Sequence, residues 1–231
     1  MRSKFRTVVL VLVGALALSG VAVASASAAL PEIVNSKGGE LVKKKFTSKA
    51  STAESERFLE TKTQGLFKCT GFSGKGEVKG TRGGEETSTY TGCMYSPFGC
   101  NTAGSRAGEI TFTTSVTPVY LNKAEQKVAL LLSLKPGGLQ FECASGLMKV
   151  TLSGAFLVHV GTVNKLKTTY NFETKQNEGI QELREYENEA GEKVKINLES
   201  EASGYKAWSK QPSAPETYWE TTFEEEAEFK A

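Results

Sequence analysis

Short runs of alternating hydrophobic and polar residues recur along the chain. In residues 219–229, Trp219, Phe223, Ala227 and Phe229 alternate with glutamates, and residues 110–116 and 193–199 alternate in the same way. A period of two is typical of strands with one buried face. Residues 128–132 and 155–158 are apolar throughout, which predicts strands covered on both faces. Weaker alternation marks residues 40–48, 55–62, 75–81, 86–92, 147–153, 166–173 and 180–187, and a short helix over 53–59 competes with one of these strands.

Turn residues separate these runs, for example at 35–39, 82–84, 122–125, 135–138 and 188–191. Most links have hairpin length and are too short for crossover helices. We therefore predict an all-β fold, an antiparallel, meander-rich barrel or sandwich of about ten to thirteen short strands. No linker divides the chain, so we expect residues 29–231 to form a single β-rich domain.

The first 28 residues have the pattern of a secretory signal peptide. Arg2, Lys4 and Arg6 precede an apolar run of about a dozen residues, which is too short for a comfortable membrane span. Ala26-Ser27-Ala28 then matches a cleavage site. We expect a secreted or cell-surface protein that has no membrane span once the signal is removed.

Charge and composition exclude several functions. Without the three basic residues of the leader, 25 Lys and Arg face 26 acidic residues, a net charge of −1. That balance gives no support to nucleic-acid binding. Every acidic residue is a glutamate, so a Ser-His-Asp triad, an EF-hand and an aspartic-protease dyad are excluded.

Four cysteines in an exported chain predict two disulfides. Cys93 and Cys100 flank a turn-rich segment, whereas Cys69 and Cys143 each share a strand face with bulky apolar residues. These patterns favour Cys93–Cys100 with Cys69–Cys143, and the other two connectivities stay open. Intervening lengths of 23, 6 and 42 residues do not form the paired knuckles of a zinc site.

Eight segments of the chain together carry a family resemblance: 67–70, 90–93, 104–110, 120–124, 128–132, 141–143, 162–165 and 224–231. They resemble a family of exported proteins from high-GC Gram-positive bacteria. The resemblance covers nearly the whole mature chain, is loose between residues 174 and 218, and implies a secreted, β-rich, four-cysteine domain. It carries over no functional residue.

Catalytic motifs are weak. His159, the one histidine, has no nucleophile motif beside it, and we interpret it as structural. Paired glutamates can serve a glycosidase as acid and base, so Glu85–Glu86 and the run 224–226 keep a small glutamate-dependent hydrolase as the alternative function. Glu225 of that run falls on the apolar side of its strand.

Four aromatic residues surround a two-proline loop near the C-terminus: Tyr205, Trp208, Tyr218 and Trp219. Flat aromatic rings on a β-surface suit stacking on sugars or covering an apolar ligand. We expect Trp219 to pack in the core. Trp208 lies between Ala207 and Ser209, with Lys206 and Lys210 close by, so we expect it to be exposed as part of a stacking platform.

The leading hypothesis is an exported, non-enzymatic binding or cell-envelope-associated domain without a cofactor. Its partner would be a small molecule, a glycan or an envelope component. An outer-membrane barrel is disfavoured by the four cysteines and by strands that are apolar on both faces.

Overall fold

The computed structural model of this chain describes residues 30–51 and 58–231. The predicted signal peptide and most of the competing helix at 53–59 lie outside the described residues. Within them the chain forms 20 strands and no helix: β1 (Glu32–Val34), β2 (Lys45–Ala50), β3 (Leu59–Thr61), β4 (Gly65–Phe67), β5 (Gly71–Gly80), β6 (Gly83–Thr91), β7 (Met94–Tyr95), β8 (Phe98–Asn101), β9 (Ile110–Asn122), β10 (Lys127–Leu134), β11 (Leu139–Cys143), β12 (Met148–His159), β13 (Lys167–Glu173), β14 (Gln176–Asn177), β15 (Ile180–Gln181), β16 (Glu185–Glu187), β17 (Lys193–Lys195), β18 (Leu198–Gly204), β19 (Trp208–Ala214) and β20 (Tyr218–Lys230).

The prediction of an all-β, antiparallel fold is confirmed, and the predicted strand number was too low. Eighteen strands join one antiparallel network, and β14 and β15 pair separately. Bends raise the number: the run 193–199 is divided into β17 and β18, which are separated by Ile196 and Asn197. The described residues show no ladder between β12 and β13, so the network is not the closed barrel that was one of the two expected architectures.

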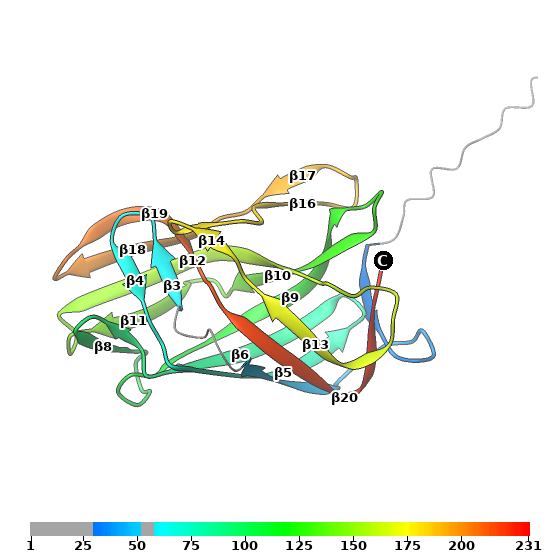
Figure 1. Ribbon diagram of the computed structural model, residues 1–231, viewed down its shortest axis with the longest axis horizontal. Helices are drawn as coiled ribbons and strands as arrows, with labels where there is room; N and C mark the ends of the chain where they lie inside the picture. The colour runs from blue at the N-terminus through cyan, green and yellow to red at the C-terminus, as the bar shows by residue number, and fades with distance from the viewer. Residues whose placement is uncertain (1–29, 52–57) are drawn as a thin grey trace, which may run out of the picture.

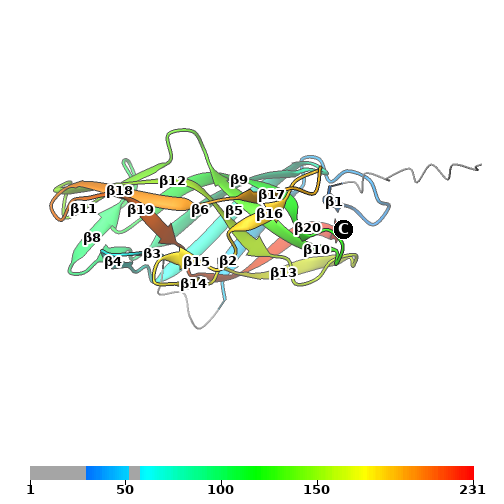
Figure 2. The ribbon, with the colours of Figure 1, turned by 90° about the horizontal axis from the view of Figure 1, so that it is seen from above.

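The network has two parts that share one strand. The main part runs β13–β20–β2–β5–β6–β9–β10–β12, and the tip part runs β7–β8–β11–β12–β18–β19–β3–β4. Figure 1 shows the tip part at the end of the molecule away from the C-terminus, and Figure 2 shows β9 and β12 on the side opposite β13. Residues 155–159 of β12 pair with β10, whereas residues 148–154 pair with β18. Gly154, at the change of partner, has φ +101°, and a Cβ there would lie 2.0 Å from the Asn197 carbonyl oxygen.

Central strands are covered on both faces, as their composition predicts. Leu130 and Leu132 of β10 lie in the large core, while Ala129 of the same strand lies in a second cluster on the opposite face. The chain between β15 and β18 covers that second face with three partly buried residues, Leu183, Tyr186 and Ile196.

The last strand also confirms its predicted faces. Phe223 and Phe229 of β20 are buried, and Glu226 is exposed. Glu225, predicted on the apolar side, is only partly buried because its carboxylate turns toward Lys44 Nζ at 3.4 Å. The strand therefore has one apolar face and one face of solvated carboxylates.

Candidate binding site at the hairpin tips

The four cysteines form a row across neighbouring strands beside the tip. Cys143 of β11 lies directly opposite Cys100 of β8, and the Cys100 N–H donates to the Cys93 carbonyl at 2.9 Å. The β5–β6 register, in which Gly71 faces Thr91, places Cys69 opposite Cys93 when it is continued by two residues. All four side chains are buried.

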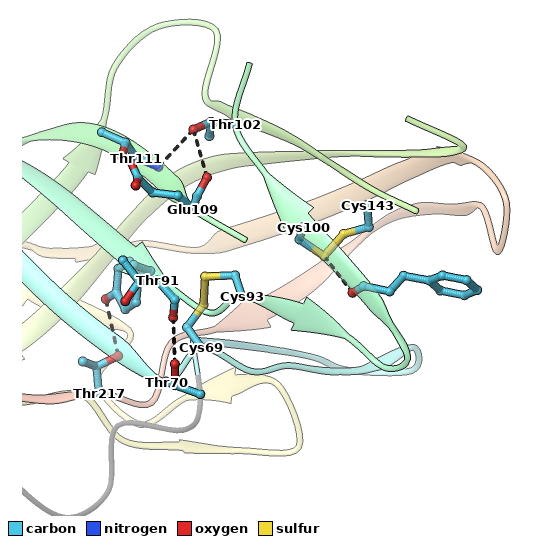
Figure 3. Close-up of a disulfide and its surroundings, with 12 residues drawn as sticks. Cys69, Thr70, Thr91, Cys93, Cys100, Thr102, Glu109, Thr111, Cys143 and Thr217 are labelled. Atoms are coloured by element: carbon cyan, nitrogen blue, oxygen red, sulfur yellow. Dashed lines mark hydrogen bonds between the residues drawn. A yellow bond between two sulfur atoms is a disulfide. The ribbon is translucent and has the colours of Figure 1, made fainter. Parts of the chain in front are cut away.

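This row explains the disulfides, and it shows that the predicted pairing was wrong. The bonds are Cys69–Cys93 and Cys100–Cys143, with Cα–Cα distances of 4.0 and 4.1 Å (Figure 3). Cys69 and Cys143 are the two ends of the row, three strand spacings or roughly 14 Å apart, which is too far for a disulfide. Cys93 and Cys100 are neighbours, as the turn between them predicts, but each bonds to its outer neighbour. No cysteine is free.

Both tryptophans are core residues, so the expectation of an exposed Trp208 was wrong. Trp208 is 8% exposed; its ring centroid lies 6.2 Å from that of Phe67, and its Nε1 donates to Ser200 Oγ at 3.2 Å. Trp219 is buried as expected, and its ring centroid lies 6.0 Å from that of Phe72.

The two tyrosines of the predicted platform remain at the surface, but on separate elements. Tyr205 is 48% exposed in the turn between β18 and β19. Tyr218 is 37% exposed at the start of β20, where its backbone pairs with Glu173 of β13. The four predicted residues therefore do not form one platform, and of the two exposed tyrosines only Tyr205 lies in the tip part.

Three hairpin turns meet around Tyr205. The Tyr205 N–H donates to the Leu147 carbonyl at 2.9 Å, which joins the β18–β19 turn to the β11–β12 turn. The ring of Phe98, from the β7–β8 hairpin, meets the Tyr205 ring edge to face at 5.7 Å. Leu147 is 68% exposed. We call Phe98, Leu147, Tyr205 and Lys206 the tip cluster.

Lys206 links the exposed ring to the buried rings beneath it. Its Nζ lies 5.7 Å from the Tyr205 ring centroid and 5.2 Å from that of Tyr95. Tyr95 is itself buried, stacks on Phe67 at 4.8 Å, and donates its hydroxyl to the Gln64 carbonyl at 2.6 Å. The tip cluster thus stands on a rigid aromatic layer to which Trp208 also belongs.

Within the described residues, the core of the main part has little space for a ligand. The cavity inside the core of the main part has a volume of about 30 Å³, lined mainly by aromatic and aliphatic side chains. Ligand cavities measure about 300–1,000 Å³, and a single water needs at least about 10–15 Å³. This cavity has room for one or two waters and not for an organic ligand.

The glutamates named as hydrolase candidates do not converge. Glu85 and Glu86 are adjacent on β6 and face opposite sides of the sheet: Glu85 binds Lys79 and Lys135 on the outside, and Glu86 is buried. In the run 224–226, Glu224 accepts the Lys45 N–H at 3.1 Å on the surface. His159 is exposed.

One carboxylate pair that sequence patterns did not indicate is Glu60 with Glu216. Gln176 Nε2 donates to Glu60 Oε2 at 2.5 Å and to Glu216 Oε2 at 2.8 Å, so the two oxygens are at most about 5.3 Å apart. That spacing is near the one used by retaining glycosidases, but the amide fills the space where a sugar would have to bind. The three side chains instead tie β14 to β3 and to the loop before β20.

Comparison with models of known families, with curated proteins and with solved structures finds no match. Among the described residues, no helix has the length and hydrophobicity that crossing a membrane requires.

Proposed function

We propose that this chain is an exported, non-enzymatic binding domain that contacts a glycan through the tip cluster. The observation that carries the proposal is Tyr205, a half-exposed ring held outward by Phe98 and Lys206 beside a core that has no room for a ligand. Two disulfides are consistent with export. The resemblance to exported Gram-positive proteins supports the same location.

The chemistry of the cluster favours a sugar. A pyranose presents an apolar C–H face and a rim of hydroxyls, and an aromatic ring beside hydrogen-bond donors complements both. Tyr205 supplies the ring, and the Lys206 ammonium, which lies over that ring, supplies three donors. Because Phe98 and the aromatic layer below hold these groups in place, little conformational entropy would be lost on binding.

Finer features of the fold belong to the same proposal. We propose that residues 29–231 act as a single domain, and that its main part packs as a curled sandwich around the core. Such a rigid body would present the tip cluster at one end, away from the C-terminus (Figure 1).

A glycan array followed by titration with the best-bound oligosaccharide tests the proposal. We expect Tyr205→Ala to weaken binding about ten-fold or more, equivalent to about 1.4 kcal/mol, without lowering the unfolding temperature. Tyr218→Ala is the matched control, since Tyr218 is also a partly exposed tyrosine but lies outside the tip cluster. A glycan whose affinity ignores Tyr205, or binding only to lipid vesicles, would contradict the proposal.

A further inference from the structure

One carboxyl group lies inside the core of the main part. Glu86 of β6 is 5% exposed, and its Oε1 has no hydrogen-bond partner within the described residues. Of the glutamates that the structure describes, it is the one that is buried. A buried carboxylate without a partner is energetically unfavourable, so its surroundings decide which protonation state the fold accepts.

The neighbouring strands leave space for this side chain but give it few partners. On β5, Gly74 makes the space, since a Cβ there would lie 2.1 Å from Glu86 Oε1. On β2, the Ser48 hydroxyl faces the carboxyl and also bonds Thr221 Oγ1 of β20 at 2.8 Å. On β9, Thr114 lies directly opposite Glu86, and its hydroxyl also lacks a partner.

No cation faces Glu86 from the described strands packed around it. The one inward titratable neighbour is Tyr90 on β6; burial raises the pKa of that phenol, and its hydroxyl meets Thr217 Oγ1 at 3.4 Å. Eight charged residues of the adjacent strands have the opposite parity and lie on the outer face: Lys45, Lys49, Lys75, Glu77, Lys79, Glu85, Glu220 and Glu224. Glu225 of β20 has the parity of Phe223, but its side chain is 40% exposed and pairs with Lys44 Nζ. The rest of the cavity wall is apolar apart from Thr221: Ile33, Phe46, Val78, Gly84, Val116, Leu130, Leu132, Phe172, Trp219, Phe223 and Phe229.

We propose that the folded chain holds Glu86 as a neutral carboxylic acid, and that this makes the core a pH-sensitive element which weakens as the pH rises. A neutral acid needs no counter-ion and fits an apolar cavity beside the hydroxyl groups of Ser48, Thr114 and Thr221. An ionised Glu86 would lose its hydration with no charge to replace it.

Linkage gives the direction of the effect. Loss of hydration in the core raises the pKa of Glu86 above its ordinary value of 4.5, and the Ser48 hydroxyl lowers it by less. Between the unfolded and the folded pKa the folded chain binds more protons than the unfolded chain, so stability falls as the pH rises through this window. Below this pH window both the folded and the unfolded chain carry the proton on Glu86, and above it the loss of stability is complete.

The test is urea unfolding of the wild type and of Glu86→Gln from about pH 4 to about pH 8, with the disulfides intact. Glutamine keeps the shape of the neutral acid but cannot ionise. We expect the two midpoints to be close at the acid end and to separate as the pH rises, with Glu86→Gln the more stable protein at the alkaline end. The inference would be overturned if the urea midpoints of the two proteins changed in parallel with pH, or if the wild type became more stable relative to Glu86→Gln as the pH rises.

Glu85→Gln is the matched control. Its hydrogen bond to Lys79 lowers the pKa of Glu85, which therefore contributes stability above the unfolded pKa that is lost as the pH falls. As the pH rises, the wild type should become more stable relative to Glu85→Gln, whereas it should become less stable relative to Glu86→Gln.

Infrared spectroscopy of the folded wild type gives a second measurement if Glu86→Gln fails to fold. At about pH 6, where solvated glutamates are ionised, the carbonyl band of one protonated carboxylic acid should remain. Its absence would overturn the inference. Neither measurement involves a glycan, so the outcome is independent of the proposed function.

Discussion

Trp208→Ala tests whether the tip is supported by a rigid aromatic layer. The substitution removes an indole that contacts Phe67 and Tyr95 and donates a hydrogen bond to Ser200 Oγ. Ser200 keeps a partner, since its hydroxyl also bonds Ser213 Oγ at 2.6 Å. The main loss is therefore packing and the cavity that remains.

Truncating a buried tryptophan to alanine costs about 3–5 kcal/mol. For a chain of this size each kcal/mol lowers the unfolding temperature by about 2–4 °C, so we expect a fall of about 6–20 °C. Trp208→Phe keeps most of the apolar contacts and loses the hydrogen bond, for which about 1 kcal/mol is expected.

Far-ultraviolet circular dichroism is the appropriate probe, because the substitution removes one of the two tryptophans that would report by fluorescence. Urea and thermal unfolding of the wild type, Trp208→Phe and Trp208→Ala should give that order of stability. A cost below about 1 kcal/mol for Trp208→Ala would refute the reasoning, because it would mean that the indole is solvated.

Two further predictions concern the last strand and the disulfides. Phe223→Ala should cost about 3–5 kcal/mol and Glu226→Ala less than about 0.5 kcal/mol in urea unfolding, and the reverse order would invert the faces of β20. Replacing Cys100 and Cys143 together by alanine should cost about 4 kcal/mol from loop entropy. A non-reducing digest of the wild type should recover Cys69 bonded to Cys93 and Cys100 bonded to Cys143, and any exchanged pair would contradict the cysteine row.

Strand faces could be predicted from the sequence wherever polar residues mark the solvent side sharply. The carboxylates of β20 alternate with Phe223 and Phe229 over a long run, so parity alone separates the two faces. β6 lacks such a mark: Glu86, Ser88 and Tyr90 face inward, but Glu85, Thr87 and Thr89 on the other face are also polar, so parity alone does not tell the two faces apart.

Predicting the disulfide pairing requires the register of the strands, and the character of the side chains alone does not reveal that register. Cys69 and Cys143 both have apolar neighbours, and this indicates burial but not which strand lies opposite. The turn at residues 82–84 does not contain the signal by itself, because counting outward from the pair Gly80–Gly83 would bring Cys69 level with Met94. The register shift between Val78 and Gly80 moves the pairing by one residue, and only then is Cys69 level with Cys93. Cys100 and Cys143 become opposite only once β8 pairs with β11, a contact between distant segments.

The prediction that Trp208 is exposed was wrong because most of its sequence neighbours are polar, whereas its spatial neighbours are aromatic. Ala207, Ser209 and two lysines surround it in the chain, whereas Phe67 covers it from β4. Local composition could not reveal a contact between residues so far apart in the sequence. Tyr205 was a candidate for the stacking platform, and its exposed ring contacts Phe98 and Leu147 only because three hairpins meet, which the sequence pattern did not indicate.

β12 has a consequence for how such a chain can diversify in evolution. One half of this strand pairs with β10 and the other half with β11 and β18, so a break within it would leave unpaired backbone groups in both parts. Neither part can be inherited, duplicated or exchanged as a module without the other. Sequence variation is then best tolerated in the turns, because insertions there do not disturb the ladders of β12. The turns at one end are those that carry Tyr205 and its neighbours.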